Sequence, residues 1–215
     1  KTMDTFIRIL QELPPRELSP EEDAVWVKER KAKAVEHIRE AARILLTGQL
    51  SIKDLVLSKS LSRENYANEN QEHLAVVRKL AERGLPTPTI GDRVYFVYTM
   101  APKQADSSAE LKGHMIADNP KWVLENDIPI DYGYYFDHKF KKPIISVMSH
   151  FLMDDMTEVV FRENPAKEEV TMKDIAAAVD RHLFGTSSNK LVKRHTQLRH
   201  AKFTGLKVTN PKADR

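Results

Sequence analysis

A long amphipathic helix is the strongest constraint that this sequence places on its fold. Residues 19–22 read Ser-Pro-Glu-Glu, which supplies a serine cap, a proline at the first helical position and acids in the first turn. The apolar residues that follow recur at helical spacing and predict one buried stripe: Val27, Ala34, Ile38, Ala41 and Leu45. The opposite face is expected to be solvated: Lys28, Arg30, Lys33, Glu36 and Arg39. The helix is therefore predicted over residues 20–46, with Gly48 just past its end.

Weaker periodicity and capping signals predict the other elements. Further helices are expected over residues 3–12, 72–83, 131–153 and 172–184. In the second of these the inward side chains are expected to be Leu74, Val77, Leu80 and Ala81. The third is expected to be kinked or broken at Pro143. Strands are predicted over 54–58 and 91–100, with 112–117 as a candidate returning strand and 120–129 irregular. The predicted fold class is α+β, helix-dominated, with a small central antiparallel β element.

Composition excludes several classes of protein. None of the 215 residues is cysteine, which rules out a disulfide scaffold, cysteine zinc sites, iron–sulfur clusters and cysteine nucleophiles. No apolar run approaches the roughly 18 residues that a membrane span needs. The net charge is +3, but residues 181–215 hold nine Lys/Arg and one acid, +8 in all, which leaves −5 for the remainder. This basic end fits either a polyanion partner or a solvated terminus. The chain does not begin with methionine, so a fragment or a processed chain is expected.

The residues considered alone offer little catalytic chemistry. The sequence has no Gly-rich phosphate loop, no nucleophile elbow and no His-Glu-x-x-His motif. Asp154 and Asp155 form a tight acid pair that suits either Mg²⁺ or a solvated helix end. His195 and His200 lie in the basic end without an acidic partner nearby, so a metal site there is weakly supported.

Signals for nucleic-acid binding are stronger. A stretch rich in hydrogen-bond donors follows the first predicted strand and comprises Lys59, Ser60, Ser62, Arg63, Asn65 and Tyr66. Such side chains contact phosphates without reading sequence, although a plain surface loop has the same composition. Arg93 suits either a phosphate contact or an ion pair with Asp92 or Asp131. The tyrosines at 132, 134 and 135 suit either a base-stacking face or the protein core.

Four blocks between residues 54 and 143 follow one another in a specific order. They are the lysine-hydroxyl-leucine-hydroxyl-arginine string at 59–63, a helix led by His73, Gly-Asp-Arg-Val at 91–94 and Pro-Ile-Asp-x-x-Tyr-Tyr at 129–135. This series resembles the thumb region of family B DNA polymerases, in particular the eukaryotic delta-type branch and the large DNA-virus members. Residues 1–18 and those after about 151 lie outside the resemblance.

The resemblance implies a thumb-like helical bundle that grips the primer-template duplex behind the active site. The thumb region is expected over residues 1–153, followed by a C-terminal helical extension over 154–185 and a basic tail, expected to be disordered, over 186–215. Lys59 and Arg63 would contact phosphates, and Ser60 and Tyr66 would donate hydrogen bonds to backbone oxygens. The full set of expected DNA contacts is Lys59, Ser60, Arg63, Tyr66, His73, Arg78 and Arg93.

The resemblance covers only part of a nucleotidyltransferase. The Tyr-Gly-Asp-Thr-Asp-Ser block of the family's palm, which carries its magnesium ligands, does not occur here. The chain alone is therefore expected to be inactive and to bind no metal, whereas the complete DNA-directed DNA polymerase would use Mg²⁺. Expected partners are the duplex, the palm and fingers in the same or a separate chain, and a processivity factor, with no membrane. The expected location is the nucleus, a host nucleus or a viral replication compartment.

Two other classes of function remain open at this point. One is a non-enzymatic, sequence-independent DNA-binding or processivity subunit that acts in trans. The other is a replication scaffold whose helices bind protein.

Overall fold

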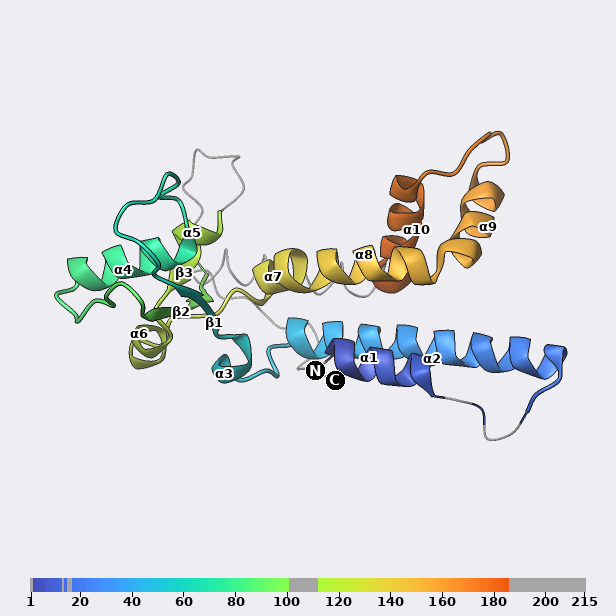
Figure 1. The fold of residues 1–215 in the computed structure, drawn as a ribbon, viewed down its shortest axis with the longest axis horizontal. Helices are drawn as coiled ribbons and strands as arrows, with labels where there is room; N and C mark the ends of the chain where they lie inside the picture. The colour runs from blue at the N-terminus through green and yellow to red at the C-terminus, as the bar shows by residue number, and fades with distance from the viewer. Residues whose placement is uncertain (1, 13, 15–16, 101–111, 186–215) are drawn as a thin grey trace, which may run out of the picture. The chain divides into compact units, whose positions relative to one another are not determined.

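The computed structural model describes residues 2–12, 14, 17–100 and 112–185, and these fall into two compact units. Among these residues, one unit combines those up to Thr47 with Phe136 to Gly185, and the other comprises Gly48 to Tyr135 (Figure 1). The predicted helix-dominated α+β class is confirmed, since the described residues are mostly helical and include one three-stranded antiparallel sheet. No helix in this described part combines the length and apolar character needed to cross a membrane. The expectation of a disordered tail over 186–215 lies outside the described residues.

The first unit is built on α2 (Pro20–Leu46), the predicted long helix. Its cap is as expected, because the Ser19 hydroxyl accepts the Glu22 amide and the Glu22 carboxylate accepts the Ser19 amide. Thr47 forms the C-cap, and Gly48 follows with φ of 70°. Helix α1 (Thr2–Gln11) packs along α2.

Two expectations for the faces of α2 are wrong. Val27 is 44% exposed, whereas Arg30 is 7% exposed and buried. The Arg30 guanidinium pairs with Glu12 and lies 4.2 Å from the centre of the Trp26 ring. Packing of the preceding segment against this end of α2 therefore covers a position that periodicity alone placed in solvent. Ala34, Ile38 and Leu45 are buried as predicted.

The rest of the first unit is a set of packed helices. They are the π-helix η1 (Phe136–Lys141), α8 (Lys142–Phe151), α9 (Met153–Glu163) and α10 (Met172–Phe184). Figure 1 shows α9 and α10 side by side at the end of α8. The predicted Thr171–Asp174 capping box begins α10, and Phe184 meets the Phe136 ring edge to face at 5.3 Å. Pro143 lies in the first turn of α8, directly after the π-helical break.

The second unit contains the sheet, in the order β1 (Leu57–Ser60), β2 (Arg93–Tyr98), β3 (Ala117–Asp118). β1 runs antiparallel to β2 with Ser60 opposite Arg93, and β2 runs antiparallel to β3 with Tyr98 opposite Ala117. Burial alternates over the first four residues of β2: Arg93 and Tyr95 are exposed, and Val94 and Phe96 are buried. The alternation fits a sheet with one face packed and the other open.

The helices of this unit correct several sequence expectations. They are α3 (Ile52–Leu55), α4 (Glu72–Glu82), α5 (Gly113–Ile116), α6 (Pro120–Glu125) and α7 (Tyr132–Tyr135). Residues 52–55 are helical, so the first strand starts later than predicted. Residues 120–125 are helical rather than irregular, and only 117–118 of the candidate returning strand pair with β2. The buried face of α4 is also different from the prediction: His73, Ala75, Val76 and Leu80.

A tyrosine cluster fills the interior of the second unit. The Tyr135 hydroxyl donates to the Leu55 carbonyl at 2.8 Å and accepts the Tyr98 amide at 3.1 Å. Tyr98 meets the Tyr135 ring at 5.1 Å and the Tyr134 ring at 4.6 Å. Tyr135 is 4% exposed and packs on Tyr98, so the structure supports a core role for Tyr135, whereas Tyr132 and Tyr134 are only half-buried.

Candidate nucleic-acid interface

The open face of the β1–β2 pair presents Arg93 beside two serines. Side chains alternate along a strand, and cross-strand partners share a face, so Arg93 lies on the same face as Ser58 and Ser60. Its Nε and Nη2 donate to the Ser58 hydroxyl at 3.1 and 2.8 Å. The Asp92 carboxylate instead accepts the Thr89 amide and hydroxyl at 2.8 and 2.9 Å. Arg93 is thus held in place by a neutral hydroxyl, and its charge is not cancelled there.

Lys59 lies on the opposite face of the sheet, against which α4 packs, and its side chain is 47% exposed. Its ammonium pairs with the Glu72 carboxylate at 2.8 Å, and the Tyr98 hydroxyl donates to the other Glu72 oxygen at 3.1 Å. Partial burial of Glu72 disfavours its charge, but the Lys59 ammonium, the backbone amide at the start of α4 and the Tyr98 hydroxyl outweigh burial. They lower the pKa of Glu72 to about 2. Lys59 is thus already neutralised by an ionised carboxylate at neutral pH.

His73 is buried, whereas the sequence analysis expected it to contact DNA at the surface. Its side chain is 2% exposed, and neither ring nitrogen has a hydrogen-bond partner among the residues that the structure describes. The Tyr66 ring meets it edge to face at 5.3 Å. Burial lowers the pKa of His73, and the nearby Lys59 charge lowers it further against the opposing effect of Glu72, so the ring is neutral at pH 7. His73 therefore supports Tyr66 from below.

The Tyr66 loop is ordered by its own contacts. The Tyr66 hydroxyl accepts the Ser62 amide at 2.8 Å, and the Arg63 guanidinium lies 5.7 Å from the centre of the Tyr66 ring. Arg63 forms no ion pair with a carboxylate of the described residues. Its charge is therefore exposed and uncompensated, like that of Arg93, while Tyr66 limits its freedom.

A groove of about 800 Å³ runs beside this loop. Arg78 on α4 lines it together with Arg63 and Tyr66, and Leu74 and Val77 of α4 form part of its apolar wall. Arg78 is partly compensated, because its Nη2 donates to the Glu69 carbonyl at 3.3 Å and its Nη1 lies 3.9 Å from the Glu69 carboxylate. The groove accounts for the half-exposed state of Leu74 and Val77, which the sequence predicted to face the core.

The expected site residues thus lie in one unit but on separate surfaces. Arg63, Tyr66 and Arg78 share the groove, Ser60 and Arg93 share the open sheet face, and Lys59 is on the face against which α4 packs. Sequence reasoning missed Ser58 and Glu72, which orient Arg93 and Lys59. A usable signal for Glu72 was its place in the first turn of α4, and for Ser58 its alternation with Ser60 along the strand.

The described residues do not provide a metal centre. Across residues 2–12, 14, 17–100 and 112–185, no three His, Cys, Asp or Glu side chains gather in a way that suits an ion. Asp155 pairs with Lys31 at 2.6 Å, and Asp154 with Asp155 belongs to the first turn of α9. The magnesium of a polymerase reaction therefore does not fit the side chains in this part of the chain. His195 and His200 lie outside the described residues.

We expect the second unit to lose stability in acid, because protonation of Glu72 removes its stabilising charge. Its pKa is about 2 in the folded chain and near 4.5 when unfolded, so its stabilisation is complete above pH 4.5 and is lost as the pH falls toward 2. Allowing for solvent around Lys59, wild type should lose about 1–2 kcal/mol relative to Glu72→Gln over this range. Urea unfolding of both proteins at several pH values measures the difference. Parallel pH profiles would show that the Lys59–Glu72 pair contributes nothing.

Comparison with known proteins places this chain in a polymerase family. The model for DNA polymerase family B matches residues 8–151. A DNA polymerase of Paramecium bursaria Chlorella virus NY2A is 34% identical over 138 residues, which cover 64% of this chain and 14% of that protein. The DNA polymerase delta catalytic subunit of Drosophila melanogaster is 30% identical over 130 residues, 60% of this chain and 11% of the subunit.

A herpesvirus protein shows the same pattern. The DNA polymerase catalytic subunit of Rhesus cytomegalovirus (strain 68-1) is 34% identical over 119 residues, 54% of this chain and 11% of that subunit. The chain thus spans between 11% and 14% of the length of these three relatives. The family model covers more than half of the chain and includes all four blocks of the sequence resemblance. This chain therefore belongs to DNA polymerase family B.

Proposed function

We propose that this chain is the C-terminal thumb portion of a replicative DNA-directed DNA polymerase and that it grips the primer-template duplex through its phosphates. The observation that carries the proposal is the state of Arg63 and Arg93. Both arginines lie within the matched blocks, both are exposed, and both are held by neutral groups, Tyr66 and Ser58. Exposed cations that are pre-oriented but not neutralised are suited to phosphate oxygens, which give affinity without reading bases.

The contacts in this proposal follow from the two exposed surfaces. Arg93 with Ser60 on the open sheet face provides a guanidinium and a hydroxyl for adjacent backbone oxygens. Arg63 and Arg78 provide two guanidinium groups along the groove, and the Tyr66 ring packs from the loop onto His73 of α4. Lys59 would join them only by exchanging Glu72 for a phosphate. None of these residues touches a reacting atom, so the thumb would act by positioning the duplex.

The proposal assigns residues 1–153 to the thumb, 154–185 to a helical extension and 186–215 to a basic tail. The family match over residues 8–151 supports the first of these three assignments. Nucleotide addition, with its Mg²⁺, would take place in palm and fingers outside this chain, and a processivity factor would be a further partner. The names of the relatives support a nuclear or viral replication site.

We expect the purified chain to extend no primer. The reason is the lack of a palm aspartate block in the sequence, together with the lack of a carboxylate cluster in its described part. A primer-extension assay with Mg²⁺ and all four nucleotides measures this directly, with an intact family B polymerase as positive control. Extension activity that follows the chain through successive purification steps would overturn the assignment as a thumb portion.

The gene distinguishes this proposal from a subunit that acts in trans. If the reading frame upstream of Lys1 encodes a palm with paired aspartates, the thumb belongs to an enzyme chain. A frame that begins at this chain would instead favour a separate DNA-binding subunit.

A further inference from the structure

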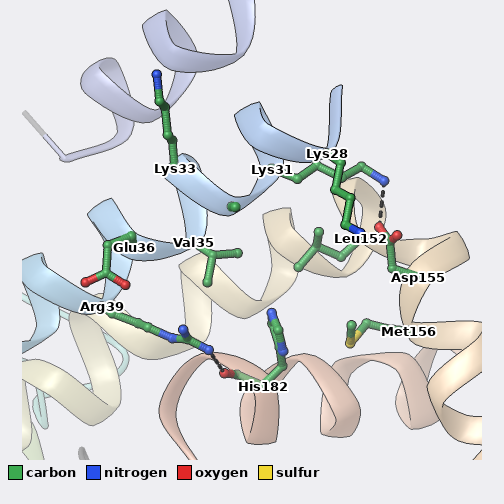
Figure 2. Close-up of a pocket in the computed structure, with 11 residues that line it drawn as sticks. Lys28, Lys31, Lys33, Val35, Glu36, Arg39, Leu152, Asp155, Met156 and His182 are labelled. Carbon is green, nitrogen blue, oxygen red and sulfur yellow. Dashed lines mark hydrogen bonds and ion pairs between the residues drawn. The ribbon is translucent and has the colours of Figure 1, made fainter. Parts of the chain in front are cut away.

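The first unit holds a pocket that the duplex contacts do not use. It has a volume of about 590 Å³ and lies among α2, the start of α9 and α10 (Figure 2). Val35, Leu152 and Met156 provide apolar side chains at its base. These three residues are at most 6% exposed, so the base is part of the packed core of the unit. A cavity of this size accommodates a few large side chains of a ligand.

Basic side chains outnumber carboxylates among the described residues that line this pocket. Four basic side chains line it, Lys28, Lys31, Lys33 and Arg39, against the two carboxylates of Glu36 and Asp155. Lys31 pairs with Asp155 at 2.6 Å, and Arg39 donates to the His182 carbonyl at 2.6 Å and so keeps its charge. Figure 2 shows Lys28 extending from α2 toward Leu152, while Lys33 points away from His182.

Lys28 is the rim cation best placed to meet a ligand. It is exposed and pairs with no carboxylate in the part of the chain that the structure describes. Partial burial and the Arg39 charge lower the pKa of His182, which leaves its imidazole neutral at pH 7. The mouth thus combines positive charge with a neutral hydrogen-bonding ring above an apolar base.

We propose that this pocket binds an acidic peptide segment of a partner protein, which inserts a large aliphatic or aromatic side chain between flanking carboxylates. The apolar base would receive the inserted side chain, and Lys28 with Arg39 would receive the carboxylates. Single-stranded nucleic acid fits less well, because it needs aromatic rings for base stacking, and among the described residues His182 alone brings a ring to this pocket. The chain's own residues 186–215 are strongly basic and would be repelled by the rim.

The test uses the full chain with ¹³C-labelled methionine and leucine methyl groups. The probe is a library of short peptides rich in Asp and Glu around one Leu or Phe. The methyl signals of Leu152 and Met156 should shift, and the dissociation constant of the best peptide should fall below about 1 mM. Lys28→Glu should weaken binding by roughly three- to tenfold, since it replaces attraction by repulsion at an exposed site. Ala32→Trp, which fills the mouth from an exposed position on α2, should abolish the shifts.

Matched controls decide between the possible occupants. Lys173→Glu makes the same charge change at an exposed position of α10 outside the pocket and should change affinity less than about twofold. The proposal is overturned if no library member shifts the methyl signals at about 1 mM, or if a library with Lys in place of the acids binds equally well. It is also overturned if a short oligothymidylate binds more tightly at the same methyl groups. Self-association of the chain that Lys28→Glu abolishes would overturn it as well. The outcome is independent of duplex binding, which involves the other unit.

Discussion

Replacing Asp118 with alanine is expected to lower the free energy of unfolding by about 2–4 kcal/mol. Asp118 is 5% exposed and accepts two hydrogen bonds from the Arg83 guanidinium, at 2.7 and 2.8 Å. The Asn119 amide also donates to it at 2.7 Å. Its removal leaves a partly buried guanidinium and an amide without their acceptor, which costs more than the pair itself contributes.

The effect should be visible at Trp122, because the Arg83 guanidinium lies 4.3 Å from the centre of that ring. Urea unfolding followed by Trp122 fluorescence, in a Trp26→Phe background, isolates this unit. Glu125→Gln is the control, since Glu125 pairs with Lys121 at 3.7 Å on the exposed side of α6 and should cost about 0.5 kcal/mol or less. Equal urea midpoints for the two variants would show that the ion pair does not hold α4 to the sheet.

The elements that sequence could predict are those with local signals. The capping boxes at Ser19 and Thr171 fix the starts of α2 and α10 through contacts within four residues. The start of α6 carried such a signal and was missed: Asn119 accepts the Lys121 and Trp122 amides, and Pro120 occupies the first turn. The expected kink or break at Pro143 also rests on a local signal, because proline lacks the amide that a helix interior needs, and the structure has a π-helix that ends directly before α8.

The buried faces were harder to predict because they depend on distant segments. Periodicity identifies a stripe on α4 but not which of two adjacent stripes meets the sheet. The structure buries His73 and Val76 and leaves Leu74 and Val77 on the groove. Likewise Arg30 is buried because Glu12, in a different part of the sequence, pairs with it. Such contacts have no trace in local spacing.

The residue types of the candidate site were predictable from the sequence, but which of its cations form ion pairs with carboxylates was not. Lys59, Arg63 and Arg93 all carry one positive charge, and a sequence does not rank them as phosphate ligands. The structure separates them, because Glu72, thirteen residues from Lys59, neutralises only that one. Of these three cations, Arg63 and Arg93 are therefore the ones whose charge no described carboxylate compensates, and we propose these two as the main phosphate contacts.

The double substitution Arg63→Ala and Arg93→Ala is expected to weaken duplex binding by on the order of tenfold to a hundredfold. The log–log salt slope should become shallower by about one to two units, since each lost phosphate contact removes roughly 0.9. Lys59→Ala alone should have a smaller effect, because binding a phosphate there first requires breaking the Glu72 pair. Fluorescence anisotropy with two unrelated duplexes at several salt concentrations measures both quantities.

The comparison between variants is what makes this last result decisive. Lys121→Ala removes a cation on α6 that is 85% exposed and lies 3.7 Å from Glu125, so its effect reports the general loss of one surface charge. Both duplexes should weaken equally, because phosphate contacts do not read sequence, and a preference above about a hundredfold would contradict that mode. If Lys59→Ala weakens duplex binding more than the double substitution does, the ion pair with Glu72 does not restrain Lys59. If the double substitution binds as wild type does, the duplex lies elsewhere, and the open sheet face and the groove are not the interface.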